Sequence, residues 1–336
     1  ESEKFNLVMD YVKHNYNWNN FNDKFASKSP KEFVDEKVGN CADLNLFTIG
    51  LLNSVGIESH PLIISTRNHG KVYVDYPFSH FFNYVIIAAK VDGKMVLADA
   101  TEILSKNNRI PTRCINDKGL LVQKDKNEWI DLYCTFASSL SFYMQVAIDE
   151  SDMAVDLNLT GTEYDALNLR KSKPEFNENY NVIDSTIQIK NQKDITKPYK
   201  LKYSYTAKTE FINDKIYVSP FLNEVLSDNP LKQEERKYPV DMIYPQRRSF
   251  SSTLLNPEGY MLDYVPKNLN ISNDLFELSY SVGKSDDKTV IVLGYYFKKP
   301  SYNPNEYSKI KDYFDVIVKK GNEKVVFVKD EIVEHK

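Results

Sequence analysis

The stretch that decides the fold is Gly39-Asn40-Cys41-Ala42-Asp43, which opens an apolar segment that ends at Gly56-Ile57. Asn40 is a favoured N-cap residue, so the pattern predicts a helix from Cys41 to about Val55. A cysteine at a helix N-terminus is stabilised as a thiolate by the helix dipole and by free N–H groups. Cys41 is therefore the candidate nucleophile, although free cysteine is also common as a small buried residue.

Composition indicates a globular chain of several domains. The 336 residues predict two or three domains, and a hydrophobic content of 42% is enough for their cores. No run of ~18 apolar residues occurs, so we expect no transmembrane span. A net charge of −4 with both signs mixed does not favour nucleic-acid binding.

Cysteine usage predicts neither a disulfide framework nor a metal site. Cys41, Cys114 and Cys134 are irregularly spaced, and no Cys-x-x-Cys or zinc-type cluster accompanies them. No cofactor motif is present either. The chain opens with Glu1-Ser2-Glu3 and has no signal-peptide pattern, which indicates a cytoplasmic protein or a mature or truncated chain.

The order of predicted elements favours an α+β core followed by β-rich regions. Residues 1–130 read as helices followed by strands at 61–66, 82–91 and 94–100. Residues 131–245 read mostly as strands and form a predicted middle domain. Residues 246–336 read as a second β-rich domain with one helix near 307–318.

A predicted hairpin brings an acid beside an aromatic residue. Asp92-Gly93 is a typical two-residue hairpin turn, which places Ile86 opposite Asp99 and Tyr84 opposite Thr101. Asp99 is then diagonal to Tyr84 on the same face, within ~7–8 Å. A Cys-His-Asp triad would place its acid and its histidine in this arrangement. Here the histidine position holds Tyr84.

Three motifs together resemble the bacterial transglutaminase-like superfamily. They are Gly39–Asp43 with Gly56-Ile57, Phe82–Ile86, and Leu97–Thr101. The resemblance implies a papain-like fold of a helix packed on an antiparallel sheet, with Cys41 as nucleophile and Asp99 as the acid. Tyr84 stands where many members have histidine, which departs from the pattern that amide-bond chemistry needs.

The rest of the chain is similar to a group of exported bacterial proteins that have a transglutaminase-like core and β-rich domains of unknown function. The resemblance implies a periplasmic or cell-surface location. In that group another β-rich domain usually precedes the core, so we expect a truncated or processed chain. The similarity is carried by four segments: residues 113–119, residues 128–129, residues 235–240, and residues 257–260 together with Pro266.

Two residues are candidates for the missing base. His80 would lie ~13 Å before Tyr84 along an extended strand, so it reaches Asp99 only if a loop from Pro77 folds it back. Tyr84 is a neutral phenol with a reference pKa near ~10, and it donates a hydrogen bond more readily than it accepts a thiol proton. General-base catalysis is usually worth ~10²–10⁴-fold, so its loss leaves a slow or inactive site.

Other polar residues near these motifs have simpler interpretations. Asp43 reads as a first-turn helix acid whose charge would raise the pKa of the thiol. Trp18, with Asn17 and Asn20, is a candidate wall or oxyanion donor, or else a core residue. Four further histidines are interpreted as surface, helix-end or terminal residues: His14, His60, His69 and His335.

Three functions therefore stay open. One is a slow but active cysteine peptidase or amide transferase that uses Cys41 with His80. The second, which the Tyr84 departure favours, is a degraded enzyme that binds a peptide, a cell-envelope amide or a glycan without turnover. The third is a non-catalytic envelope scaffold that tolerates loss of Cys41.

Overall fold

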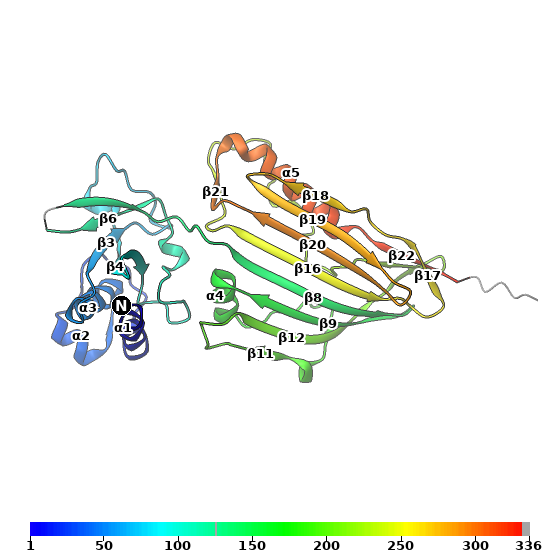
Figure 1. Ribbon diagram of the computed structural model, residues 1–336, viewed down its shortest axis with the longest axis horizontal. Coiled ribbons are helices and arrows are strands. Elements are labelled where there is room, and N and C mark those ends of the chain that lie inside the picture. Colours follow the sequence, from blue (N-terminus) through cyan, green and yellow to red (C-terminus); the bar gives the residue numbers. More distant parts are fainter. Residues whose placement is uncertain (125, 331–336) are drawn as a thin grey trace, which may run out of the picture. The chain divides into compact units, whose positions relative to one another are not determined.

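In the computed structural model the chain forms two compact units, Glu1–Cys134 and Thr135–Lys336 (Figure 1). The structure describes residues 1–124 and 126–330. Within this part, no helix is both long enough and apolar enough to span a membrane.

The N-terminal unit packs helices on an antiparallel sheet, as the sequence predicts. Its helices are α1 (Ser2–Asn15), α2 (Pro30–Glu36) and α3 (Cys41–Ser54). Its five-stranded sheet has the order β5-β4-β3-β6-β7. These strands are β3 (Ser59–Ile64), β4 (Tyr84–Val91), β5 (Lys94–Ala98), β6 (Lys118–Val122) and β7 (Asn127–Asp131). Two short strands, β1 (Asn17–Trp18) and β2 (Val38–Gly39), pair in parallel just before α3.

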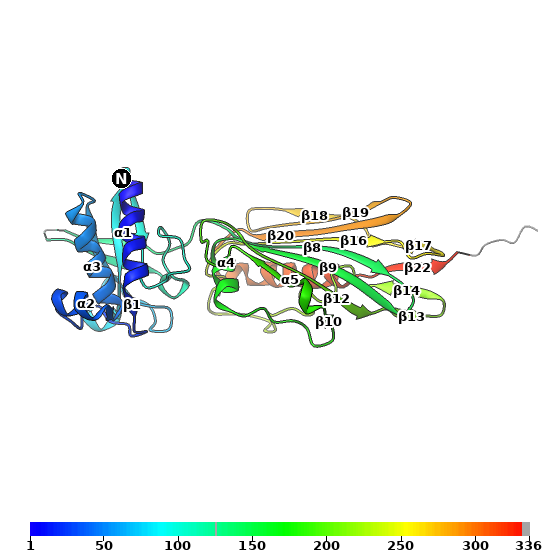
Figure 2. The ribbon, with the colours of Figure 1, turned by 90° about the horizontal axis from the view of Figure 1, so that it is seen from below.

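Helix α3 is the centre of this unit because it is apolar on nearly every side. Leu44 and Leu52 of α3 and Ile87 and Ala98 of the sheet are buried in one core, together with Met9 of α1. Burying α3 in this way fixes its N-terminus, and with it Cys41, against the start of β4. Figure 2 shows α1 and α3 side by side.

The predicted hairpin register is confirmed from the turn to the pair of Ile87 with Ala98, and the expected pairs of Ile86 with Asp99 and of Tyr84 with Thr101 lie beyond the end of β5. Asp92 and Gly93 have φ of 48° and 75°, which is the left-handed backbone that a tight two-residue turn requires. Val91 pairs with Lys94, and the ladder continues to the pair formed by Ile87 and Ala98. The turn therefore brings the start of β4 beside the residues that follow β5.

The C-terminal unit is built on one nine-stranded sheet. Eight of its strands follow the order β10-β12-β9-β8-β16-β20-β19-β18, and β11 also pairs with β12. Strands β8 and β16 pair in parallel. The strands are β8 (Ser138–Ile148), β9 (Asp152–Gly161), β10 (Asn181–Val182), β11 (Gln188–Lys190), β12 (Tyr199–Lys208), β16 (Gln246–Leu255), β18 (Leu269–Ser272), β19 (Phe276–Lys284) and β20 (Lys288–Phe297).

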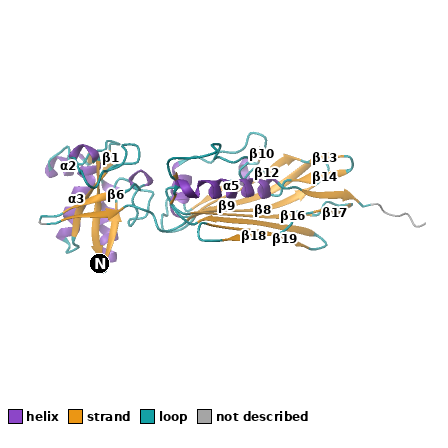
Figure 3. Ribbon diagram, turned by 90° about the horizontal axis from the view of Figure 1, so that it is seen from above, coloured by secondary structure: helices purple, strands orange, loops and turns teal. Residues whose placement is uncertain are grey.

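Smaller elements complete this unit. A four-stranded sheet has the order β13-β14-β22-β17, and β15 pairs with β21. Helix α4 (Glu163–Lys171) follows β9, and α5 (Tyr307–Asn322) lies along one face of the large sheet (Figures 2 and 3). The remaining strands are β13 (Glu210–Ile212), β14 (Lys215–Val218), β15 (Val240–Asp241), β17 (Tyr260–Tyr264), β21 (Ser301–Tyr302) and β22 (Val325–Lys329).

The expected division at residue 245 does not separate two bodies in this structure. Strand β16 begins at Gln246 and lies between β8 and β20, so both predicted β regions contribute to one sheet. A 3₁₀ turn, Asp184–Thr186, separates β10 from β11. Strand β9 has the alternation of a strand with one buried face, since buried Val155 and Leu157 flank exposed Asp156.

Candidate functional site

Cys41 begins α3 as predicted, but its thiol is enclosed. The side chain has no exposed surface. Its Sγ accepts a hydrogen bond from the backbone N–H of Asp23 at 3.3 Å and donates one to the Asp23 carbonyl at 3.0 Å. Burial raises the pKa of the thiol to about 12, and the Asp99 charge adds to the rise, while the Asp23 bonds and Arg113 oppose it. The position of Cys41 at the helix N-terminus therefore does not lower the thiol pKa enough to offset the rise that burial causes.

The segment that covers Cys41 is fastened by α3 itself. Asn40 and Asp43 form a capping box, and Asp43 also accepts hydrogen bonds from Ser27 N at 2.9 Å and Lys28 N at 3.1 Å. Gly39 is required here, because an added Cβ would lie 2.6 Å from the Cβ of Asp43. Asp43, read from sequence as a helix acid, is thus also the anchor of the loop over the nucleophile.

Tyr84, at the position where the resemblance implies a histidine, bonds to Asp99, the expected acid. Its hydroxyl donates to Asp99 Oδ2 at 2.9 Å and lies 3.0 Å from Thr101 Oγ1. Both Tyr84 and Asp99 are fully buried. Asn45 of α3 donates to the same carboxylate oxygen at 3.1 Å, and Thr101 donates to the other through its N–H at 2.8 Å and through its hydroxyl. Asp99 is therefore held by neutral donors.

Arg113 is the site residue that the sequence reading did not find. Its Nη2 donates to Tyr84 Oη at 3.1 Å and to Thr101 Oγ1 at 2.5 Å. Its guanidinium lies 4.4 Å from the ring centroid of Trp18. It belongs to the 3₁₀ turn Thr112–Cys114, which precedes β6. The sequence does not predict that Arg113 contacts Tyr84, because Arg113 lies outside the β4–β5 hairpin and only the folded chain brings the two together.

These bonds fix Tyr84 as a neutral donor. Burial, and then the Asp99 charge, raise the pKa of Tyr84 well above its ordinary value. The phenol O–H donates a hydrogen bond to Asp99, and the phenol oxygen accepts one from Arg113. A neutral phenol that accepted a proton would become an oxonium, which is not a base available near neutral pH.

His80 is not part of this cluster. It lies in the 3₁₀ turn Ser79–Phe81, and its ring is exposed and packs 4.3 Å from the Phe81 centroid and 5.7 Å from that of Phe78. Among the described residues, no hydrogen bond joins it to Cys41 or Asp99. The loop does not fold it back.

The other candidates also have local partners. Trp18 Nε1 donates to the Phe21 carbonyl at 2.9 Å, so this indole N–H is engaged. His60 lies 3.4 Å from Glu58, His69 lies 3.0 Å from the His80 carbonyl, and His14 bonds to the Asp10 carbonyl at 2.7 Å. His335 lies outside the described residues. In the described part of the chain, no cluster of three or more His, Cys, Asp or Glu residues has the geometry of a metal site.

A buried lysine also lies near Asp99. Lys13 of α1 is 5% exposed and donates to the Ser105 carbonyl at 3.0 Å. Burial lowers the pKa of this lysine to about 8, against the opposing charges of Asp99, Asp10 and Glu102. The Asp99 cluster consists of Asp99 and its neutral donors Asn45, Tyr84 and Thr101. The positive charges of Arg113 and Lys13 lie around these donors.

Residues 1–133 match the transglutaminase-like superfamily, and residues 214–327 match DUF3858, a domain of unknown function. The N-terminal unit is a transglutaminase-like core. Among curated proteins, no sequence matches this chain. A similar solved structure is described as a "putative protease" from Parabacteroides distasonis, with 14% identity and a TM-score of 0.54. The match covers 97% of this chain but 52% of the other, so this chain spans about half of that protein's length.

Proposed function

We propose that the transglutaminase-like core binds a peptide or a cell-envelope amide without cleaving it. The observation that carries the proposal is the hydrogen bond from Tyr84 to Asp99, which occupies the place of the histidine–acid pair. The enclosed Cys41 thiol supports the same conclusion, because a cysteine that attacks an amide bond must contact the substrate as a thiolate. The extracytoplasmic location implied by the resemblance is part of this proposal.

Exposed aromatic side chains support binding. Tyr73, Tyr76 and Phe78 are 59–68% exposed on the loop before β4, and Phe21 and Phe25 are exposed on the loop over Cys41. Lys24 joins the two loops by donating to the Phe82 carbonyl at 3.1 Å. Clustered exposed rings are typical of recognition surfaces, since they lose solvent contact favourably when a partner covers them.

The catalytic half of the proposal is tested by assaying casein hydrolysis and incorporation of a fluorescent primary amine into casein. We expect wild type and Cys41→Ala to give the same signal as a blank without protein. Activity in wild type that disappears in Cys41→Ala would overturn the proposal. Cys41→Ser serves as a closer-sized control for any folding defect, which circular dichroism would reveal.

The binding half is tested by calorimetric titration with disaccharide-peptide fragments of bacterial cell wall. We expect Phe78→Ser and Tyr76→Ser to weaken binding by roughly fivefold or more, as loss of an aromatic contact does. Leu7→Ser, on α1 and 64% exposed, is the matched control and should leave binding unchanged. Equal effects of the loop variants and the control would contradict a recognition role for the loop.

A further inference from the structure

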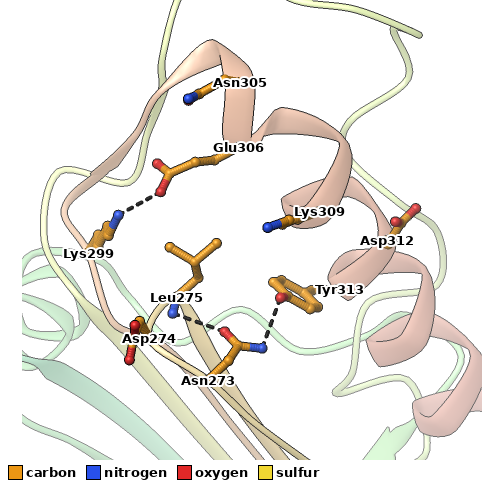
Figure 4. Close-up of a pocket in the computed structure, with 9 residues that line it drawn as sticks. All are labelled: Asn273, Asp274, Leu275, Lys299, Asn305, Glu306, Lys309, Asp312 and Tyr313. Atoms are coloured by element: carbon orange, nitrogen blue, oxygen red, sulfur yellow. Dashed lines mark hydrogen bonds and ion pairs between the residues drawn. The ribbon is translucent and has the colours of Figure 1, made fainter.

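The C-terminal unit contains an open pocket of about 760 Å³ between α5 and the turn that joins β18 to β19. Figure 4 shows the residues that line it. The volume lies in the range of small-molecule sites, which is ~300–1,000 Å³. The lining residues are Asn273, Asp274, Leu275, Lys299, Asn305, Glu306, Lys309, Asp312 and Tyr313.

The walls of the pocket are fixed by hydrogen bonds. Asn273 donates to Tyr313 Oη at 2.9 Å and accepts from Leu275 N at 2.9 Å, which ties the β18–β19 turn to α5. The Tyr313 ring stacks on Phe276 with centroids 4.4 Å apart. The Leu275 carbonyl accepts from Tyr302 Oη at 2.8 Å. The apolar floor is therefore held in place from both sides.

Some charged side chains of the pocket already have partners, and others are available to bind a ligand. Lys299 and Glu306 form an ion pair at 2.6 Å, and Glu306 also accepts from Asn303 N at 2.9 Å, so both are engaged. No hydrogen bond or ion pair within the described residues holds Lys309, Asp312 or Asp274. Figure 4 shows the Lys309 ammonium directed toward the middle of the pocket, with Asp274 and Asp312 at its edges.

We propose that this pocket binds a short zwitterionic peptide. Its carboxylate would pair with the Lys309 ammonium near the middle of the pocket, and its ammonium would pair with Asp312 or Asp274 at the edge. Its side chains would cover Leu275 and the Tyr313 ring. A single inorganic anion would satisfy Lys309 but leave the apolar floor and the edge carboxylates unused. The proposal concerns the C-terminal unit and does not depend on the function proposed for the transglutaminase-like core.

Trialanine is a suitable probe, because three residues span at most ~10 Å and carry one charge of each sign. Calorimetry measures its affinity for the full chain, and amide NMR shifts locate it. We expect saturable binding, with shifts concentrated at 273–275 and 305–313. N-acetyl-trialanine and trialanine amide should each bind at least about fivefold more weakly, since each loses one charge-assisted hydrogen bond.

Lys309→Gln should weaken trialanine binding by about fivefold or more and should remove most of the difference between trialanine and its amide. Lys319→Gln, exposed on the last turns of α5 and outside the pocket, is the matched control and should bind as wild type does. The proposal is overturned by a lack of saturation, by equal binding of the capped peptides, by shifts outside this pocket, or by inorganic phosphate binding as tightly as trialanine does.

Discussion

Each unit contains a buried Asp and Tyr beside a partly buried Arg, yet the two sets are connected differently. In the C-terminal unit, Arg248 contacts Asp165 directly through both Nη atoms, at 2.9 and 3.0 Å, and Tyr244 lies to one side at 3.3 Å. In the transglutaminase-like core, Tyr84 lies between Asp99 and Arg113.

The difference separates a direct ion pair from a carboxylate whose hydrogen-bond donors are neutral. Asp165 also accepts from Ser138 Oγ at 2.6 Å, so its charge is neutralised where it joins α4 to β8 and β16. Asp99 instead accepts hydrogen bonds from the Asn45 amide of α3 and from the Tyr84 phenol, and neither donor carries a charge.

The largest expected effect is on the C-terminal pair. Asp165→Asn removes one partner of a buried ion pair and leaves Arg248 uncompensated, which should lower the free energy of unfolding by about 3–5 kcal/mol. Asp152→Asn breaks the exposed pair with Lys208 and should cost about 0–1 kcal/mol. Urea titration measures both, and a loss below about 1 kcal/mol for Asp165→Asn would contradict the assignment.

Tyr84→Phe tests the same comparison in the core. It removes one donor from Asp99 and one acceptor from Arg113, and should cost about 1–3 kcal/mol. Tyr280→Phe is the matched control, because the Tyr280 hydroxyl is buried without a hydrogen-bond partner among the described residues. Equal unfolding midpoints for the two variants would show that the Tyr84 hydroxyl is not needed to satisfy Asp99.

Lys13, which lies near Asp99, should make the free energy of unfolding depend on pH. Its pKa is about 8 in the folded chain and 10.5 ordinarily, so between these values the unfolded chain binds more protons. Stability from this group therefore rises with pH across that window, by up to about 1.4 kcal/mol per pH unit. The slope of unfolding free energy against pH should fall in Lys13→Met and stay at the wild-type value in Lys31→Met, whose exposed lysine lies on α2. Identical slopes in all three would contradict the burial of Lys13.

The smallest expected effect concerns His80. Because this ring is exposed and packs on Phe78 and Phe81, His80→Gln should change the rate at which iodoacetamide modifies Cys41 by less than about twofold. Modified peptides are quantified by mass spectrometry. A tenfold slower modification would revive His80 as the base and would favour an active enzyme.

Local patterns were sufficient for the hairpin and the nucleophile helix. The Asp92-Gly93 turn fixes register over a few residues, and the Asn40 capping box fixes the start of α3, so Tyr84 and Asp99 could be paired from sequence. The enclosure of Cys41 could not be predicted from sequence, because it depends on where the backbone of Asp23 returns to the helix.

Long-range pairing limited the rest. Arg113 reaches Tyr84 through a 3₁₀ turn that no periodic pattern announces. Strand β16 pairs in parallel with β8, which begins 108 residues earlier at Ser138, and a parallel pair between distant segments leaves no turn signal to predict it. Residue 245 was expected to be a domain boundary because the sequence does not reveal that β8 and β16 pair.

The central claim is that Cys41 is not an activated thiol. The most direct test is its peptide-resolved rate of alkylation by iodoacetamide in the native chain between about pH 6 and pH 10. With a pKa of about 12, the rate should rise about tenfold per pH unit with no plateau, because the thiolate fraction stays small throughout. A plateau with a midpoint below about pH 8 would contradict the account and identify Cys41 as a working nucleophile.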